Sequence, residues 1–217
     1  MARGKFFPAV RALKSAKRQD DRDPEILADL GLAQLGSRSL TRAEKTLKDS
    51  LKRRRLLRAQ EGLAKVYRER RKYGDAAKAF SSAAYLAKKK GRDDKEVAEL
   101  YIEGGKAWLK DRRTKNRYAR ARHMFRKAVK LTPDDIATLY LIAESYDREE
   151  KLSAARRAYM DVLEKDANHT QALYRLGLIE YDEGSDKKAK EYLERYLKTG
   201  AKGRDANRAR KLLSKIK

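Results

Sequence analysis

The sequence contains no cysteine in its 217 residues and only three prolines. Without cysteine it can form no disulfide, no iron–sulfur cluster and no zinc site with thiolate ligands. Proline is scarce and Ala, Leu, Lys, Arg and Glu are abundant, which predicts helix along nearly the whole chain. The expected fold class is therefore all-α.

Long apolar runs are also lacking. No run approaches the about 18 residues of a transmembrane helix, and the N-terminus lacks the apolar core of a secretory signal. We therefore expect no integral membrane segment and a cytoplasmic location. Hydrophobic residues make up 41% of the chain and charged residues another 41%, a ratio that suits a helical array with much surface per residue.

Acidic residues are few in the first 130 positions, which hold 16 Asp or Glu against 38 Lys or Arg. The whole chain carries a formal charge of +24, so most of the basic excess belongs to this part. A charge of this size favours an anionic partner, which can be nucleic acid, an acidic protein surface or anionic lipid.

Catalytic and metal-binding patterns are absent as well. The two histidines, His123 and His169, lie 46 residues apart, and no nucleophile–base arrangement, metal-ligand cluster or phosphate-binding loop is recognisable. The sequence therefore predicts a protein that is not an enzyme and that uses no cofactor or metal.

What is present is a pattern that recurs about every 34 residues. Small residues recur on the predicted first helices of five pairs, at Gly31, Ala64, Gly105, Ala143 and Gly177, and on the second helices, at Ala43, Ala76, Ala121, Ala155 and Ala189. Small residues are needed where the two backbones cross, and bulky ones such as Phe80, Phe125 and Tyr159 fill the hollow between pairs. One pair cannot bury its apolar face alone, so stacking of the pairs supplies the core.

The spacing predicts a single array over residues 1–217. Its helix pairs are expected at 24–56, 57–90, 98–135, 136–169 and 170–202, with a half-repeat helix at 1–19 and a capping helix at 203–217. The third pair has 16 residues between its small positions where the others have 12, which predicts an insertion in its turn, around 114–117.

Local signals predict where helices begin. Asp23-Pro24 should open the first helix of the first pair, and Thr41 to Glu44 matches a capping box for its second helix. Thr132-Pro133-Asp134 should cap the fourth pair. Residues 1–19, with six basic residues and no acid, have two interpretations: a lone helix of the array or an amphipathic transit peptide.

These positions resemble the tetratricopeptide repeat, a 34-residue helix–turn–helix unit. Phe80, Phe125 and Tyr159 match its large aromatic position, and Leu47 and Leu193 depart from it conservatively. The resemblance covers about residues 24–203 and implies a right-handed solenoid of helical hairpins. Pentatricopeptide arrays, which read RNA, are the nearest alternative, but their repeats have 35 residues.

The resemblance implies that the first helix of each pair lines a concave face that binds a protein or peptide. In this register the groove residues are Leu32, Leu35, Glu61, Lys65, Arg68, Ile102, Lys106, Leu109, Tyr140, Glu144, Tyr174, Leu178 and Tyr181. The three tyrosines are either binding anchors or packing residues between helices. The Lys and Asn that clamp a terminal carboxylate in a known subclass are replaced by Ala28, Leu32 and Gly62, so that ligand is not expected.

We predict a protein-binding scaffold or adaptor, with a basic N-terminal half suited to an acidic partner. The alternative is a nucleic-acid-associated factor that binds phosphates without base-specific reading. A third possibility is docking to anionic membranes through the N-terminal helix. The expected anion-binding patch comprises Lys52, Arg53, Arg54, Arg55, Arg58, Arg112, Arg113, Lys115, Arg117, Arg120 and Arg122.

Overall fold

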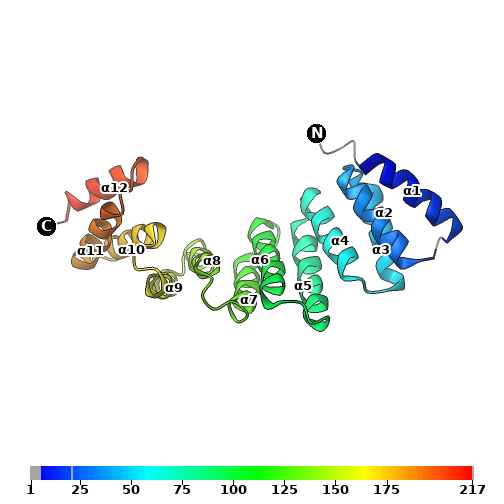
Figure 1. The fold of residues 1–217 in the computed structure, drawn as a ribbon. Helices are drawn as coiled ribbons and strands as arrows, with labels where there is room; N and C mark the ends of the chain where they lie inside the picture. Colours follow the sequence, from blue (N-terminus) through cyan, green and yellow to red (C-terminus); the bar gives the residue numbers. More distant parts are fainter. Residues whose placement is uncertain (1–5, 21, 217) are drawn as a thin grey trace. The chain divides into compact units, whose positions relative to one another are not determined.

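The computed structural model describes residues 6–20 and 22–216, and the only regular secondary structure in these residues is helical (Figure 1). The predicted fold class, an all-helical solenoid built from helical hairpins, is confirmed. The described helices are α1 (Phe6–Gln19), α2 (Pro24–Gly36), α3 (Leu40–Arg53), α4 (Leu57–Glu69), α5 (Tyr73–Lys89), α6 (Asp94–Lys110), α7 (Arg117–Val129), α8 (Ile136–Asp147), α9 (Leu152–Lys165), α10 (Thr170–Asp182), α11 (Asp186–Lys198) and α12 (Arg204–Leu213).

The chain divides into two compact units, Met1–Thr132 and Pro133–Lys217. The first unit contains α1 and the hairpins α2–α3, α4–α5 and α6–α7. The second contains the hairpins α8–α9 and α10–α11, followed by α12. A single array that runs through both units stays a prediction.

In three of the hairpins, a glycine of the first helix lies under a bulky residue of the second. A Cβ atom added to Gly31 would lie 2.5 Å from Leu47 Cγ, and one added to Gly177 would lie 2.6 Å from Leu193 Cδ2. Gly105 has the same relation to Phe125. The helices therefore approach so closely that a methyl group does not fit without movement, which is the reason the sequence repeats small residues at this position.

The helix starts agree only in part with the local sequence signals. Asp23 caps α2, since its side chain accepts hydrogen bonds from the backbone N–H groups of Glu25 and Ile26. The predicted capping box is wrong, because α3 begins at Leu40 with no side-chain cap.

The fourth pair also begins differently from the prediction, because Asp135 rather than the preceding Thr-Pro-Asp segment caps α8. Its Oδ1 accepts from the backbone N–H of Thr138 at 3.3 Å. In the third pair, α6 begins at Asp94, four residues before the expected start of that repeat.

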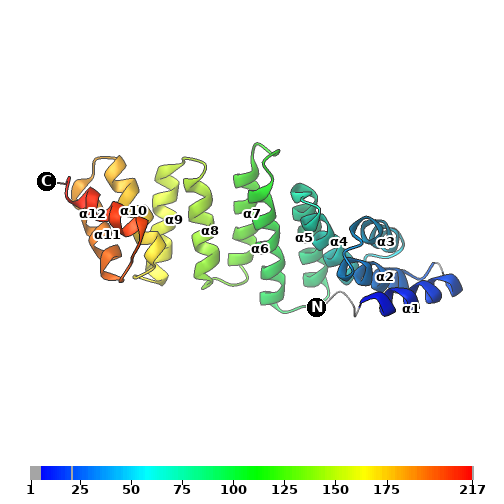
Figure 2. The same cartoon turned by 90° about the horizontal axis from the view of Figure 1, so that it is seen from above.

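The turn of the third pair is longer than the turns of the first two pairs. This turn covers residues 111–116, whereas the turns of the first two pairs cover only 37–39 and 70–72. It carries the chain beyond the helix ends in Figure 2. The Asp111 carboxylate orders it by accepting hydrogen bonds from the backbone N–H of Arg113 and the hydroxyl of Thr114.

The helices of the first unit alternate in direction, so this unit has two opposite edges. The start of α4 meets the start of α2, because Arg58 forms ion pairs with Glu25 and Asp29. The turns 37–39, 70–72 and 111–116 form what we call the turn edge, and the connections 54–56 and 90–93 form the connection edge. Helices of 13 to 17 residues separate the two edges by about 20–25 Å.

Helix α1 packs against α2. Its Leu13 and Ala16 are half-buried, whereas Ala9 and Phe7 are exposed. This packing supports the interpretation of the segment as a helix of the array, and residues 1–5 lie outside the described part of the chain.

Candidate partner-binding groove

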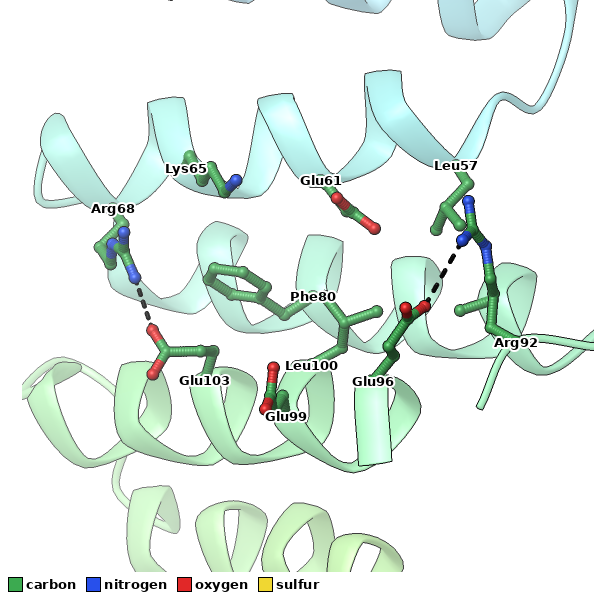
Figure 3. Close-up of a pocket in the computed structure, with 11 residues that line it drawn as sticks. Leu57, Glu61, Lys65, Arg68, Phe80, Arg92, Glu96, Glu99, Leu100 and Glu103 are labelled. Atoms are coloured by element: carbon green, nitrogen blue, oxygen red, sulfur yellow. Dashed lines mark hydrogen bonds and ion pairs between the residues drawn. The ribbon is translucent and has the colours of Figure 1, made fainter. Parts of the chain in front are cut away.

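The first unit contains a cavity of 480 Å³ between α4 and α6, with α5 beneath it (Figure 3). Phe80, only 2% exposed, comes from α5 and forms the floor together with Leu100. A second cavity of 290 Å³ shares Leu57, Glu61 and Arg92 with the first and extends to α2. We call these two cavities together the groove.

The walls of the groove come from facing sides of two neighbouring first helices. Glu61, Lys65 and Arg68 are spaced by four and three residues on α4, which places them on one side of that helix. The facing side of α6 contributes three carboxylates, from Glu96, Glu99 and Glu103.

Ion pairs close both ends of the larger cavity, as the dashed lines in Figure 3 show. Arg68 Nη1 lies 2.5 Å from Glu103 Oε2, and its guanidinium lies 5.8 Å from the Phe80 ring centroid. Arg92 Nη1 lies 3.6 Å from Glu96 Oε2 at the other end. Among the described residues, none forms an ion pair with the middle side chains Glu61, Glu99 and Lys65.

The groove has no net charge, although it lies in a strongly basic unit. Five acids and five bases line it: Glu25, Glu61, Glu96, Glu99 and Glu103, and Arg58, Lys65, Arg68, Lys90 and Arg92. The first unit as a whole holds 38 Lys or Arg and 16 Asp or Glu, for a net charge of +22. The excess cations of the unit must therefore lie outside the groove.

The predicted groove residues of the first unit fall into three groups. Lys65 and Arg68, together with Glu61, line the cavity. Leu32 and Leu35 are half-buried against the core cluster that includes Leu47. The residues predicted on α6 do not line this cavity: Ile102, Lys106 and Leu109.

The difference on α6 has a geometric cause. The three predicted positions lie on the adjacent strip of the helix, whereas the cavity is lined by the side of α6 that faces α4. Sequence reasoning missed Glu96, Glu99 and Glu103 for this reason, and it assigned Phe80 to the core without placing it under a cavity. The run of acids at spacings of three and four was the available signal.

In the second unit, packing accounts for two of the three tyrosines. Tyr174 is 8% exposed and its ring centroid lies 4.9 Å from that of Tyr196, while Leu178 is 4% exposed in the same core cluster. Tyr140 is half-buried, 5.1 Å from the His169 ring, and burial raises the pKa of Tyr140.

The other predicted groove residues of this unit are half-buried. Glu144 forms an ion pair with Arg148 at 2.8 Å, and Tyr181 lies near the end of α10. Burial makes Tyr174 and Leu178 core residues rather than groove residues.

The predicted anion-binding patch is not one surface. Lys52 to Arg55 and Arg58 lie at the connection edge, whereas Arg112 and the other members up to Arg122 lie at or beside the turn edge. Consecutive basic runs in the sequence are thus placed at opposite ends of the helices.

Several members of this patch have local partners. Arg54 and Arg58 pair with Glu25, and Lys52 pairs with Asp49 at 3.2 Å. Arg117 lies over the Tyr118 ring and Arg120 over the Trp108 ring, each within 5 Å of the centroid. Arg122 is only 4% exposed, so it is not available to a ligand.

Five of the predicted basic residues are exposed and form neither an ion pair with an acid nor a ring contact in the described chain: Arg53, Arg55, Arg112, Arg113 and Lys115. Three of these belong to the inserted turn. The only acid of that turn, Asp111, accepts hydrogen bonds within the turn itself.

Neither histidine lies in the groove. His169 caps α10, with Nδ1 accepting from the backbone N–H of Ala172, and His123 is exposed on α7. No group of three or more potential metal ligands occurs among the described residues. Within the same residues, no helix is both long and apolar enough to cross a membrane.

A tetratricopeptide repeat family profile matches residues 28–92, 107–159 and 140–209. No curated protein matches the sequence.

Solved structures share the fold. The chain is similar to YrrB, described as a TPR protein with an unusual peptide-binding site, with 20% identity, a TM-score of 0.66, and coverage of 94% of this chain and 100% of that one. For MamA from Desulfovibrio magneticus RS-1 the identity is 23%, the TM-score 0.57 and the coverage 77% and 89%. The C-terminal part of a TPR repeat-containing protein from Cytophaga hutchinsonii has 14% identity, a TM-score of 0.62 and coverage of 98% of this chain and 90% of that one.

The matched segments span well over half of the sequence, and they include at least part of each of the five predicted helix pairs. The chain belongs to the tetratricopeptide repeat family, a family of protein-interaction scaffolds.

Proposed function

We propose that this protein is a non-enzymatic scaffold that binds a segment of a partner protein in the groove of its first unit. The observation that carries the proposal is the 480 Å³ cavity between α4 and α6, which continues into the 290 Å³ cavity beside α2. Its size falls within the about 300–1,000 Å³ of ligand pockets, and an apolar floor with a few polar groups is typical of them.

The proposal can be tested with a displayed library of linear 12-residue peptides selected on the full chain. Leu100 is half-buried and lines the cavity, so Leu100→Trp should fill it without disturbing the core. We expect selected peptides, measured by fluorescence anisotropy, to lose about tenfold in affinity or more for this variant, which corresponds to about 1.4 kcal/mol.

A matched control is Met160→Trp, which introduces the same ring at an exposed position of the second unit. It should leave peptide binding unchanged. If every selected peptide binds Leu100→Trp as well as the unchanged chain, the groove is not the binding site.

A second candidate function is binding to the phosphates of a nucleic acid. The inserted turn favours this function. Arg112, Arg113 and Lys115 are exposed there, while the carboxylate of Asp111 is engaged by the turn itself. An acidic partner suggested by the net charge would also contact such edges rather than the neutral groove.

Anisotropy with labelled RNA and with a DNA duplex across a salt titration tests this function. The slope of log K against log salt should be on the order of −4 or steeper if several phosphates are contacted. Charge reversal to Glu at Arg112, Arg113 and Lys115 should flatten the slope by about 2–3. Reversal at Arg53 and Arg55, on the opposite edge, is the control, and negligible binding of both probes at physiological salt would rule the function out.

A further inference from the structure

We infer that the groove selects a partner segment that places a lysine or arginine side chain between Glu61 and Glu99, even though the surrounding unit is strongly basic. The inference rests on the proposed function of the groove. It concerns the chemistry of the ligand, which the sequence alone led us to expect to be acidic.

Ion pairs engage the arginines at the two ends of the cavity. Arg68 is engaged by Glu103 at one end and Arg92 by Glu96 at the other. Glu61 and Glu99 come from facing helices and lie between these pairs, toward the middle of the cavity (Figure 3). The groove thus holds two carboxylates that no arginine of its own walls neutralises.

Lys65 is the remaining charged side chain of the middle region. It stands one helical turn from Glu61 on the same side of α4, and the two form no ion pair in the structure. Even in solution, a contact between them would balance only one of the two carboxylates. Lys90, the other base of the groove without an ion pair among the described residues, belongs to the connection edge, so one negative charge is left in the middle of the groove for a cation of the ligand.

An apolar floor lies beneath these carboxylates. Phe80 and Leu100 lie between the two walls. The Arg68 guanidinium lies 5.8 Å from the Phe80 centroid, so the half-buried Leu100 is the part of the floor that a ligand can contact. Lysine and arginine carry an aliphatic stem below a charged head. Their stem suits the floor, and their head suits the carboxylates.

The net charge of the unit does not decide the ligand. Glu61 lies four residues after the first residue of α4, and Glu99 lies five residues after the first residue of α6, which places both about 6–8 Å along the helix axis from the connection edge and about 12–17 Å from the turn edge. The Debye length at physiological salt is about 8 Å, so the cations of the turn edge are substantially screened at these carboxylates. A side chain bound between Glu61 and Glu99 contacts both carboxylates directly, at a shorter distance than the cations of either edge.

The test uses the same displayed 12-residue library on the full chain, and it sorts binders by whether Leu100→Trp abolishes their binding. Groove-dependent peptides should be enriched in Lys or Arg and should lose about tenfold in affinity for the double variant Glu61→Gln, Glu99→Gln. The matched control is Glu164→Gln, Glu194→Gln, which removes two exposed carboxylates of the second unit and should change nothing.

The outcomes separate this inference from the proposed function. Groove-dependent peptides that lack Lys and Arg, or that bind the Glu61→Gln, Glu99→Gln variant unchanged, would overturn the inference and leave the proposed function standing. A library without any groove-dependent binder would overturn both. Acidic peptides that bind the Leu100→Trp variant as well as the unchanged chain bind outside the groove, at the basic edges. They count against a cationic ligand only if no groove-dependent peptide is found.

Discussion

The two units are built from the same hairpins but differ sharply in charge. The first unit, residues 1–132, holds 38 bases and 16 acids, for +22, whereas the second, residues 133–217, holds 18 and 16, for +2. The small-on-bulky contact is nevertheless the same, as in Gly31 on Leu47 and Gly177 on Leu193. The periodic pattern therefore specifies the packing of the hairpins and leaves their surfaces free to diverge.

The units also differ in how successive hairpins are tied together. In the first unit, Glu44 of α3 is 8% exposed and pairs with Lys48, Arg70 and Lys72, which links it to the turn after α4. This contact explains why the capping-box interpretation of Glu44 failed, since its side chain points toward the next hairpin.

In the second unit, a buried hydrogen-bond network ties successive hairpins together. The Tyr159 hydroxyl donates to Asp147 Oδ2 at 2.9 Å, and Arg175 donates two hydrogen bonds of 2.6 Å to the same carboxylate. Asp147, Tyr159 and Arg175 thereby join α8, α9 and α10. Burial and the Asp147 charge raise the pKa of Tyr159, and the hydrogen bond to Asp147 raises that of Arg175.

The largest effect is expected from breaking the network of the second unit. Asp147→Ala leaves the Tyr159 hydroxyl buried without its acceptor and Arg175 without its counter-charge, which should cost about 3 kcal/mol. Trp108 is the only tryptophan and lies in the first unit, so its fluorescence reports on that unit, while far-UV circular dichroism reports on all helices. In urea, the dichroism midpoint should fall more than the fluorescence midpoint.

The matched control is Asp182→Ala, an exposed aspartate at the end of the next first helix, which should change stability by less than about 0.5 kcal/mol. Equal losses for Asp147→Ala and Asp182→Ala would show that the network contributes nothing to the second unit.

A smaller effect on stability is expected when glycine is replaced by alanine at the same repeat position in each unit, at Gly105 in the first unit and at Gly177 in the second. A Cβ at Gly105 would meet three atoms of the Phe125 ring, whereas one at Gly177 would meet Leu193, a flexible side chain. Overpacking costs about 1–3 kcal/mol, and the better helix propensity of alanine returns about 1 kcal/mol. In urea denaturation, Gly105→Ala should destabilise by about 1–2 kcal/mol and Gly177→Ala by less than about 1 kcal/mol, and the reverse order would contradict this packing.

The contribution of Glu44 should depend on pH. Burial raises the pKa of Glu44, but hydrogen bonds and charges from Lys48 and Lys72 outweigh it, so the net pKa is lowered. A lowered carboxyl pKa contributes stability above the unfolded-state value and loses it as the pH falls through the folded-state value.

The Trp108 unfolding midpoint should therefore fall between about pH 5 and pH 3, and less steeply in Glu44→Gln, with a difference of about 1 kcal/mol at pH 7. Glu99→Gln, an exposed groove carboxylate without an ion pair in the described chain, serves as the control. Parallel pH profiles for Glu44→Gln and the unchanged protein would contradict the role of this contact.

The smallest effect concerns one turn position that has a positive φ in four of the five hairpins. Its occupants are Arg38, Arg71 and Glu150, with φ near 60°, and Gly184, with φ of 75°. A side chain at this φ costs about 1–2 kcal/mol, so Gly184→Ala should destabilise the second unit by about 1 kcal/mol. Arg71→Gly should change the stability of the first unit little, because the release of backbone strain offsets the larger conformational entropy that glycine loses on folding. A large loss of stability in thermal denaturation would contradict this account.

Several features of the fold follow from the sequence because they depend on local spacing. The 34-residue recurrence of small and bulky residues predicts the helical hairpins, since the backbone crossing demands a small residue at the same place in every copy. The four additional residues of the third pair predict an insertion in its turn, because a turn is where a stack accepts extra length.

The lining of the groove could not be predicted in full for a physical reason. The strip of α6 that faces α4 depends on how neighbouring hairpins pack, so Glu99 and Glu103 entered the cavity instead of Ile102 and Lys106. Burial of Tyr174 depends likewise on packing against α11 and α12, which lie later in the chain.

The sequence by itself determined the repeat, the hairpins and the overall excess of positive charge, because these are properties of spacing and composition. Only the tertiary structure decided where that charge lies. Antiparallel helices carried neighbouring basic runs to opposite edges about 20–25 Å apart, and the facing sides of α4 and α6 brought Glu61 and Glu99 together in the groove. The site thereby acquired a local chemistry that differs from that of the chain, because a binding surface is formed by residues adjacent in space rather than in sequence.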